Sequence, residues 1–311
     1  MKDVLFLVNP RAGMRKVIRF VPDIIRLFYE NGYRCEVFVT GRSGEAAQYL
    51  EQTDRSYDLV VCAGGDGTLN ETVSGMLSAG TTCPLGYIPC GTTNDYGSSI
   101  GLSSDIMQAA RDIMEGTPRD FDVGSFNGRH FVYTATCGAF AKASYTTSQA
   151  AKNVLGHMAY VLEGVRDLGN IKPIHMRVDT GKLIFDEDFL FCSITNSTSV
   201  GGIIKLDSEL VSLNDGQFEV TLVRNPLNPA QLSTILYALT SQDIPNEMIY
   251  FFSADHLDVR CQKPIEWTLD GEREPKTAEA KLINLHSAIR MVIPDRPEVA
   301  VLAGLASEAG T

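Results

Sequence analysis

Residues 59–71 read Leu59-Val60-Val61-Cys62-Ala63-Gly64-Gly65-Asp66-Gly67-Thr68-Leu69-Asn70-Glu71. The five apolar residues at the start predict a buried strand, and a helix is expected from about Leu69. Thr68, with Glu71 three residues later, fits a capping box for that helix. Glycines let backbone N–H groups approach an anion closely, and the helix dipole favours negative charge there. An aspartate such as Asp66 among these amides is suited to bind Mg²⁺ or a hydroxyl group. A tight strand-to-helix turn that binds no ligand is an alternative explanation for the same glycines.

Strand-like and helix-like segments alternate on both sides of this turn. Short apolar runs predict strands, and apolar residues at helical spacing predict helices. The expected strands are 4–8, 35–39, 59–63 and 85–88, and the expected helices are 17–28, one from about residue 45, one from about residue 69, and 105–114. Such alternation is typical of a parallel sheet with crossover helices.

The pattern changes after about Phe121. Asn127-Gly128 lies between two strand-like runs and predicts a hairpin turn. A long helix is expected at about 144–168, followed by strand-like runs at 174–179, 182–195, 217–223, 257–261, 265–270 and 282–293. We therefore predict an α/β plus mainly β chain, with a parallel-sheet α/β domain over residues 1–121 and an antiparallel β-rich domain over residues 122–293. Residues 294–311 are a candidate to complete the first domain, and residues 297–311 are expected to form either a packed terminal helix or a frayed tail.

Composition limits the classes of protein to consider. The length of 311 residues fits two domains. Acidic residues number 38 and basic residues 27, and the net charge of −11 disfavours binding to nucleic acid or bulk adsorption to an anionic membrane. Seven cysteines without CxxC spacing indicate reduced thiols in a cytoplasm. The apolar run Val4 to Val8 is too short for a signal peptide, and no stretch predicts a membrane-spanning helix.

Two further turn-rich segments directly follow predicted strands. They read Asn9-Pro10-Arg11-Ala12-Gly13 and Pro89-Cys90-Gly91-Thr92-Thr93-Asn94-Asp95. Because ligands of open α/β sheets bind at the carboxyl edge of the strands, we expect both loops to meet the Gly64 turn there. The chain has no GxxxxGK[ST] sequence, and Asn70 stands where a GxGxxG motif has its third glycine. A P-loop and a Rossmann dinucleotide site are therefore both disfavoured.

The ordered motifs match a known family. They are Asn9-Pro-x-x-Gly13, Thr40 with Gly44-Glu45-Ala46, residues 64–71, Pro89-x-Gly91-Thr92-x-Asn94-Asp95, Asp122-Val123-Gly124, Asn127-Gly128-Arg129-x-Phe131, Ser212-Leu213-Asn214-Asp215-Gly216 and Asp270-Gly271-Glu272. From Val4 to about Pro294 the chain resembles the soluble diacylglycerol kinase family, with sphingosine and ceramide kinases as relatives. It departs from the family pattern at Ala12, where a Ser is usual, at Tyr96-Gly97 in place of Phe-Ala, and at Ser98, where an Arg is common.

The resemblance implies a lipid kinase that transfers the γ-phosphoryl group of ATP to a lipid hydroxyl with the help of Mg²⁺. Diacylglycerol is the leading acceptor, with phosphatidic acid as product; phosphatidylglycerol, monoacylglycerol and sphingoid alcohols are the alternatives. A cytoplasmic enzyme docking at the inner membrane face is expected, and a homodimer is left open. NAD kinase shares the glycine turn but is disfavoured, because the C-terminal half has no second glycine-rich Asp loop of that kind. A non-catalytic regulator is the remaining alternative.

The resemblance also assigns residues to the ATP and metal sites. Asp66 and Asp122 are expected to organise Mg²⁺ on the phosphates of ATP. A second Mg²⁺ loop is expected from Asp215 with main-chain carbonyls of Ser212 and Gln217, although a polar β-turn explains that loop equally well. The expected nucleotide-binding residues are Asn9, Pro10, Arg11, Ala12, Gly13, Thr40, Gly64, Gly65, Asp66, Gly67, Thr68, Leu69, Asn70, Gly91, Thr92, Thr93 and Asn94.

Asp270 and Glu272 are the expected catalytic carboxylates, together with Asp66. Residues i and i+2 of an extended strand point to the same face, so both carboxylates are expected to face one cleft. By resemblance Glu272 accepts the proton of the lipid hydroxyl, with Asp270 in support. A carboxylate within hydrogen-bond reach can take that proton as the phosphoryl group is transferred.

Overall fold

The computed structural model describes residues 1–138, 172–196, 199–200, 204–205, 212–241 and 246–296. Packing divides the chain into two compact units, as far as these residues show. The first unit contains residues 1–123, 212–215 and the chain from residue 286 onward, and the second contains residues 124–211 and 216–285. The expected helix at 144–168 and most of the tail (297–311) lie outside the described residues.

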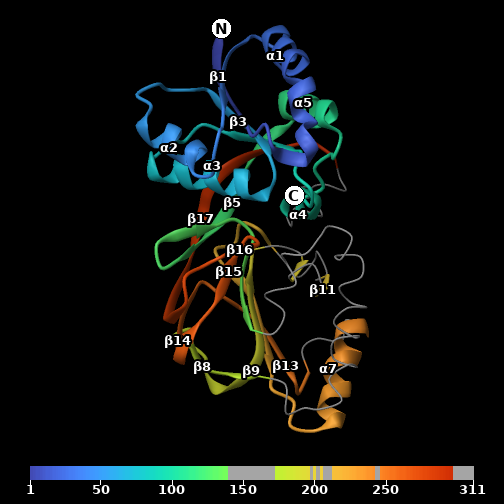
Figure 1. The fold of residues 1–311 in the computed structure, drawn as a ribbon, viewed down its shortest axis with the longest axis vertical. Helices are drawn as coiled ribbons and strands as arrows, with labels where there is room; N and C mark the ends of the chain where they lie inside the picture. The colour runs from blue at the N-terminus through green and yellow to red at the C-terminus, as the bar shows by residue number, and fades with distance from the viewer. Residues whose placement is uncertain (139–171, 197–198, 201–203, 206–211, 242–245, 297–311) are drawn as a thin grey trace, which may run out of the picture. The chain divides into compact units, whose positions relative to one another are not determined.

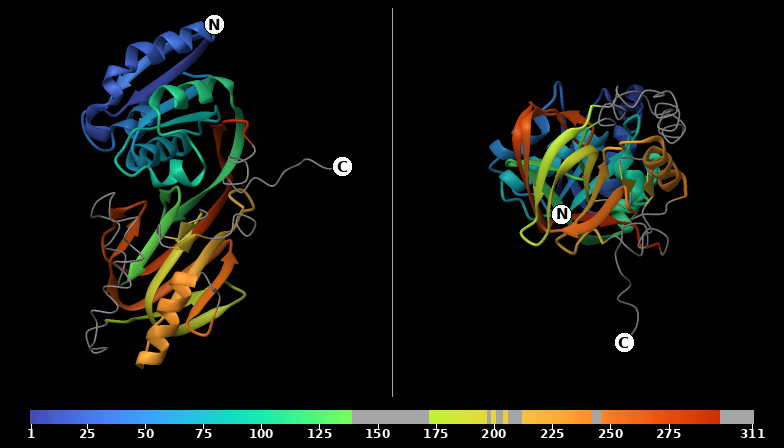
Figure 2. Two further views of the ribbon diagram at one scale, coloured as in Figure 1. Left: turned by 90° about the vertical axis from the view of Figure 1, so that its right-hand side faces the viewer. Right: turned by 90° about the horizontal axis from the view of Figure 1, so that it is seen from below.

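The first unit is a parallel sheet with helices on both faces (Figures 1 and 2). The strand order is β4-β3-β1-β2, all parallel, and the end of β17 (Thr277–Ile293) pairs with β4 at Met291 and Leu85. Its elements are β1 (Lys2–Val8), η1 (Ala12–Arg15), η2 (Val17–Arg19), α1 (Val21–Glu30), β2 (Tyr33–Val39), α2 (Glu45–Gln52), β3 (Leu59–Gly64), α3 (Asp66–Ser78), β4 (Leu85–Pro89), α4 (Asp95–Ser99) and α5 (Ile106–Glu115).

Apolar runs build the core of this unit. Residues 4–8 of β1 and 60–63 of β3 are fully buried, which explains why both strands read as continuous apolar runs and not as alternating ones. One face of the sheet packs on α1 and α5 through Ile24, Phe28 and Ile113. Figure 1 shows α2 and α3 on the opposite face. The predicted parallel α/β architecture is confirmed.

One expected helix start was wrong, and one expected helix is divided. Helix α3 begins at Asp66 and not near Leu69, because Gly65 takes the extended N-cap conformation and lets the helix start directly after the strand. No side chain caps this helix, so the expected Thr68 and Glu71 capping box does not form. The segment 17–28 divides into η2 and α1, with a proline at the start of α1, where a proline fits the first turn of a helix.

The second unit is an antiparallel sheet, as predicted. Its strand order is β16-β15-β7-β9-β8-β14-β17; in addition β12 pairs with β9 and β13 pairs with β12. Strand β6 pairs with β5 across the expected Asn127-Gly128 turn. Its elements are β5 (Thr117–Phe126), β6 (Arg129–Phe131), β7 (Thr134–Gly138), β8 (Ile174–Asp179), β9 (Ile184–Thr195), β10 (Ser199–Val200), β11 (Ile204–Lys205), β12 (Phe218–Arg224), α7 (Pro229–Ser241), β13 (Ile249–Ala254), β14 (His256–Ile265), β15 (Trp267–Leu269), β16 (Glu272–Arg273) and β17 (Thr277–Ile293).

Strands β5 and β17 each have residues in both units. The expected boundary after residue 121 therefore falls inside a strand. Residues 212–215 join the first unit, where the backbone N–H of Asp122 donates to the carbonyl of Leu213 at 2.8 Å. Residues 286–293 join it as well, since the end of β17 lies beside β4. The division of the chain into domains of residues 1–121 and 122–293 stays a prediction.

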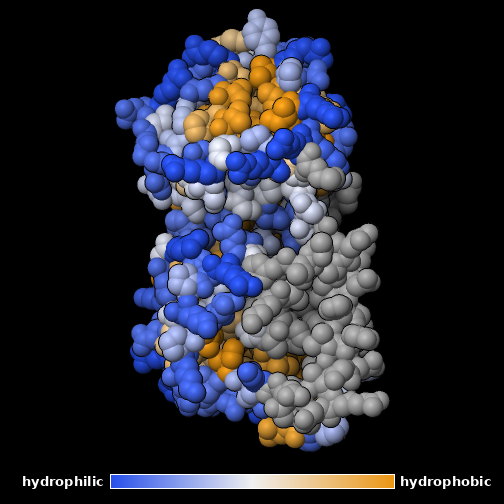
Figure 3. Space-filling model, viewed as in Figure 1, coloured by the Kyte–Doolittle hydropathy of each residue, from blue (hydrophilic) through white to orange (hydrophobic). Residues whose placement is uncertain are grey.

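An apolar core among the described residues holds the second unit together. Trp267 packs against Phe126, with ring centroids 5.1 Å apart, and Phe131 stacks on Phe218 at 5.6 Å. Most of the coloured surface of this unit in Figure 3 is hydrophilic, with hydrophobic areas over β8, β9 and β13 and at the end of the unit beside α7. Among the described helices, none is both long enough and apolar enough to cross a lipid bilayer.

Candidate active site

The loops after β1, β3 and β4 meet at one edge of the first unit's sheet. Cys90 and Gly91 each donate a backbone hydrogen bond to the carbonyl of Gly64, at 2.8 and 3.1 Å. The Asn9 side chain donates to the hydroxyl of Thr68 at 2.9 Å. The expected meeting of three loops at the carboxyl edge of the strands is confirmed.

Glycines are required at this edge because the loops approach so closely. A Cβ atom at Gly91 would lie 2.5 Å from the Cα of Gly65, and one at Gly13 would overlap the carbonyl oxygen of Cys90. Gly13 also has a φ of +49°, in the left-handed region that favours glycine. Backbone, and not side chains, therefore forms this part of the edge, which is the arrangement that phosphate-binding turns use.

Asn94 fixes the loop after β4. Its side-chain oxygen accepts the backbone N–H of Gly91 at 2.7 Å, and its side-chain nitrogen donates to the carbonyl of Gly91 at 3.3 Å. Asn94 has a φ of +52°, which asparagine tolerates better than most residues. The loop thus closes on itself, and helix α4 begins at the next residue.

Asp66 lies at the start of α3 and contacts the start of α4. Its carboxylate accepts the backbone N–H of Asp95 at 3.0 Å and that of Tyr96 at 3.2 Å. Burial first, and then the negative charge of Asp95, raise the pKa of Asp66 to about 6. A carboxylate has about four acceptor positions, so two amide bonds leave room for a cation.

Asp95 was missing from the expected binding residues, although it belongs to one of the quoted motifs. Its position directly after a strand-end loop could have pointed to it, because acidic residues are typical of the first turn of a helix.

The remaining expected nucleotide-binding residues lie at the same edge or in the helix behind it. Thr40 follows β2 and donates its backbone N–H to the carbonyl of Val8 at 2.9 Å. Leu69 is 1% exposed, so its side chain belongs to the core. Residues 10–12 follow β1, Thr92 and Thr93 are exposed on the loop after β4, and Gly67 and Asn70 belong to the first turns of α3.

Asp122 is fully buried in β5 and makes contacts away from the glycine-rich loops. Its Oδ1 accepts the backbone N–H of Ser287 at 2.7 Å and lies 3.1 Å from Nδ1 of His286. Its own backbone contacts Leu213, in the loop with Ser212 and Asp215. The structure therefore brings Asp122 beside the expected second Mg²⁺ loop. In the described residues no three His, Cys, Asp or Glu side chains gather to hold a metal ion.

Asp270 and Glu272 do not share one strand face, and the expectation that they do was wrong. Asp270 lies in the turn between β15 and β16 with a φ of +47°. Its buried carboxylate accepts the backbone N–H groups of Val132, Tyr133 and Thr134 at 2.6, 3.0 and 3.0 Å. Glu272 is exposed on β16. Three amides hold Asp270 in place, and Glu272 is the carboxylate that faces solvent.

A second contact holds the other side of this turn. Arg129, on β6, pairs with the buried carboxylate of Glu274 at 2.7 Å, and the backbone N–H of Glu274 donates to the carbonyl of Trp267 at 2.9 Å. Residues 129–134 therefore contact the turn both before and after Glu272. These contacts restrict the backbone of Glu272, although its side chain is exposed.

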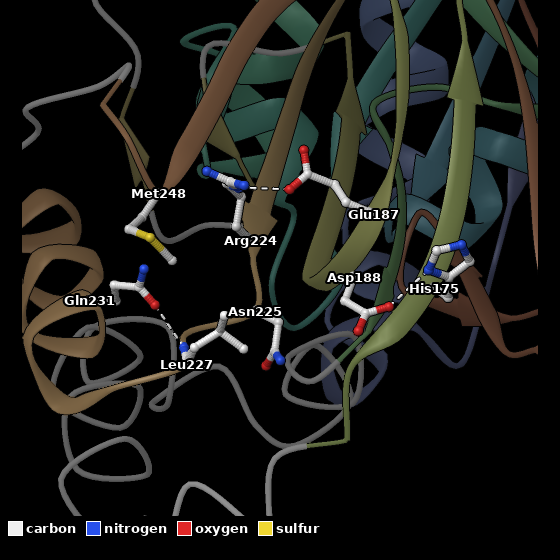
Figure 4. A pocket seen from close by; sticks show the side chains of 8 residues that line it. All are labelled: His175, Glu187, Asp188, Arg224, Asn225, Leu227, Gln231 and Met248. Atoms are coloured by element: carbon white, nitrogen blue, oxygen red, sulfur yellow. Dashed lines mark hydrogen bonds and ion pairs between the residues drawn. The ribbon is translucent and has the colours of Figure 1, made fainter.

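A pocket of about 330 Å³ lies elsewhere in the second unit, beside α7 (Figure 4). Its charged groups are paired with one another: Arg224 with Glu187 at 2.7 Å, and His175 with Asp188 at 2.9 Å. None of the expected site residues lines it. Paired groups of this kind stabilise the wall of a pocket without pointing to a ligand.

Comparison with known proteins identifies the family. The family model for the diacylglycerol kinase catalytic domain matches residues 3–126. A diacylglycerol kinase of Staphylococcus haemolyticus (strain JCSC1435) is 30% identical over 295 residues, covering 94% of this chain and 88% of that protein. The chain belongs to the diacylglycerol kinase family. A diacylglycerol kinase of Bacillus subtilis (strain 168) is 29% identical over 296 residues, covering 94% of this chain and 97% of that protein.

A solved structure agrees with the fold. The crystal structure of a diacylglycerol kinase from Bacillus anthracis (strain Sterne) matches with a TM-score of 0.72 at 20% identity, covering 96% of this chain and 98% of that chain. Diacylglycerol kinases are ATP-dependent lipid kinases, and the match to their catalytic domain confirms the expected enzyme class and ATP as co-substrate.

The two carboxylates of the Asp270-Gly271-Glu272 turn are expected to differ in their effect on stability. Asp270→Ala leaves three backbone N–H groups without their acceptor, so the free energy of unfolding should fall by about 3 kcal/mol. Glu272→Gln changes an exposed side chain and should alter it by less than about 0.5 kcal/mol. Urea unfolding of both variants measures the difference. Equal stabilities would contradict the role of Asp270 as the anchor of the turn.

Proposed function

We propose that this chain phosphorylates diacylglycerol to give phosphatidic acid, with Glu272 as the proton acceptor. The observation that carries the proposal is the 30% identity to a diacylglycerol kinase over 94% of the chain. The exposed Glu272 on a turn held from both sides adds chemical support. Phosphatidylglycerol, monoacylglycerol and sphingoid alcohols carry the same reactive hydroxyl group, so the assay below compares them with diacylglycerol.

The three loops would bind the phosphates of ATP. The backbones of Gly13, Gly65 and Gly91 leave no side chain between the loops, and α3 starts directly after Gly65. The first turn of a helix has N–H groups without intrahelical partners, and its dipole favours an anion. These features suit the binding of a triphosphate without a lysine of the P-loop type.

Mg²⁺ fits the acidic groups of the same edge. Asp66 and Asp95 are close enough for the charge of Asp95 to raise the pKa of Asp66, and a divalent cation relieves such repulsion. Carboxylate oxygens are hard ligands that suit Mg²⁺, which would neutralise charge on the phosphates. We assign Asp66 as the principal ligand, with Asp95 beside it. Asp122 and the loop of Ser212, Asp215 and Gln217 stay predicted metal ligands.

In the proposed reaction the acceptor hydroxyl attacks the γ-phosphorus of ATP. Its proton moves to the Glu272 carboxylate, the new oxygen–phosphorus bond forms, and the bond from the γ-phosphorus to the bridging oxygen breaks to release ADP. Asp270 acts on the turn and not on the substrate, because its carboxylate is buried and bound to three amides. The acceptor resides in a membrane, so the enzyme would work at the inner membrane face as a peripheral protein, and a homodimer stays a prediction.

Transfer of labelled phosphate from ATP to a panel of acceptors tests the function. Diacylglycerol in mixed micelles should be phosphorylated faster than phosphatidylglycerol, monoacylglycerol, sphingosine or NAD. Glu272→Gln should lower the turnover by about 10²–10⁴-fold, while nucleotide affinity, measured by calorimetry, stays unchanged. Transfer to NAD and to no lipid would overturn the function. Turnover within about tenfold of wild type, a change of about 1.4 kcal/mol in the barrier, would place the base elsewhere.

The raised pKa of Asp66 predicts a pH dependence. Because this pKa is about 6, the carboxylate takes up a proton as the pH falls through that value and can no longer hold a cation. Activity at low Mg²⁺ should therefore decline on the acid side of about pH 6, by about tenfold per pH unit. More Mg²⁺ should move the decline to lower pH, since cation and proton compete. If activity declines at the same pH at every Mg²⁺ concentration, the assignment of Asp66 as a ligand is wrong.

A further inference from the structure

Two arginines lie beside the turn that carries Glu272, and each of them is bound to another glutamate. Arg129 of β6 contacts the carboxylate of Glu274 at 2.7 Å, and Arg273 lies 3.8 Å from that of Glu266. Glu272 itself makes no hydrogen bond or ion pair with any residue that the structure describes. The carboxylate proposed to accept a proton therefore stays unpaired although two cations are near.

Strand pairing places Glu272 and Glu274 on the same face. The pairing of residues 272 and 273 with β15 continues to Glu274, whose backbone N–H donates to the carbonyl of Trp267 at 2.9 Å. Side chains two positions apart on a strand point to one face, and the residue between them points to the other. The Arg129–Glu274 pair thus shares a face with Glu272, whereas Arg273 belongs to the opposite face.

Arg129 is within reach of both carboxylates. Two residues of a strand span about 7 Å, and the Arg129 side chain is long, flexible and 58% exposed. Burial raises the pKa of Glu274, Arg129 opposes the rise, and the negative charge of Glu272 adds to it. The three charges therefore interact with one another, and the same guanidinium could bind either glutamate.

The choice of partner matters for proton transfer. An arginine bound to a carboxylate occupies its oxygens with hydrogen bonds and makes it a weaker base. A general base works best when its oxygen can reach the proton that it abstracts. Glu274 competes well for Arg129, because its side chain is only 3% exposed and water screens a buried pair less than an exposed one.

We propose that Glu274 is a positioning residue: by binding Arg129 it keeps the carboxylate of Glu272 unpaired and open to the acceptor hydroxyl. The proposal rests on the proposed function, which supplies the role of Glu272 as proton acceptor. Glu274 acts through Arg129 and not on the substrate, since its own side chain is buried.

The test substitutes one or both members of this pair in the full chain. Glu274→Gln keeps the shape of the buried side chain and removes its charge, so Arg129 is released and pairs with Glu272. Exposed pairs of this kind favour the bound form by about three- to fivefold. The double variant Arg129→Gln with Glu274→Gln removes both charges and leaves no guanidinium to capture Glu272.

Chemical labelling of the Glu272 carboxylate gives a readout that needs no catalysis. Carbodiimide with glycine ethyl ester modifies accessible carboxylates, and peptide mass spectrometry reports the rate at Glu272. In Glu274→Gln this rate should fall by about three- to fivefold, since Arg129 then covers the carboxylate. In the double variant it should return to within about twofold of wild type.

Turnover should follow the same order. Phosphorylation of dioctanoylglycerol in mixed micelles by Glu274→Gln should be slower by about three- to fivefold, with an unchanged KM for ATP, because only unpaired Glu272 accepts the proton. The second substitution, Arg129→Gln, should restore it. A pair with only a structural role predicts the opposite, namely that removing both members costs at least as much as removing one.

Two variants serve as controls. Glu266→Gln releases Arg273 on the opposite strand face, where that side chain is 62% exposed, so labelling and turnover should match wild type. Arg129→Gln alone leaves the buried carboxylate of Glu274 without its cation and should lower the melting temperature. Labelling of Glu272 should nevertheless not fall in this variant, since no guanidinium remains on that face to cover it.

The outcomes distinguish the two proposals. Wild-type labelling of Glu272 in Glu274→Gln, or a double variant that stays as slow as the single one, overturns Glu274 as a positioning residue. An equal loss of labelling in Glu266→Gln also overturns it. If labelling changes as expected while turnover stays at the wild-type value, Glu272 is not the proton acceptor, and the release of Arg129 by Glu274→Gln still stands.

Discussion

The contact between Gly65 and Gly91 is the constraint on which the candidate active site depends. A Cβ atom at Gly91 would come within 2.5 Å of the Cα of Gly65, so these two loops can meet in this way only where residue 91 lacks a side chain. The same closeness positions the Gly64 carbonyl for two backbone hydrogen bonds and brings the start of α4 to Asp66. An edge made of backbone follows, and such edges suit the binding of phosphate groups.

Much of this edge could be predicted from the sequence, because its signals are local. Turn residues directly after buried strands give the position of each loop, and parallel strands place such loops at one edge. The contacts of Asp122 could not be predicted in this way. Its carboxylate accepts the backbone N–H of Ser287, and that hydrogen bond joins residues far apart in the chain.

The Asp270-Gly271-Glu272 turn shows why spacing alone was not enough for the second carboxylate pair. Alternation along an extended strand predicts a shared face, but Asp270 and Gly271 form the turn between β15 and β16, with φ values of +47° and +83°. Three amides of residues 132–134 hold the Asp270 carboxylate. Those amides lie far from Asp270 in sequence. Two carboxylates two positions apart thus take different roles: the buried one fixes the backbone, and the exposed Glu272 is left available for proton transfer.

Calorimetric titration of ATP into Gly91→Ala tests the central claim, that the contact of these glycine loops builds the nucleotide site. Gly41→Ala is the matched control, since its Cβ would meet only the Glu45 carboxylate at 3.4 Å. The account predicts that Gly91→Ala weakens ATP binding by at least about tenfold, or about 1.4 kcal/mol, and that the control binds like wild type. Wild-type affinity in a folded Gly91→Ala variant would contradict it.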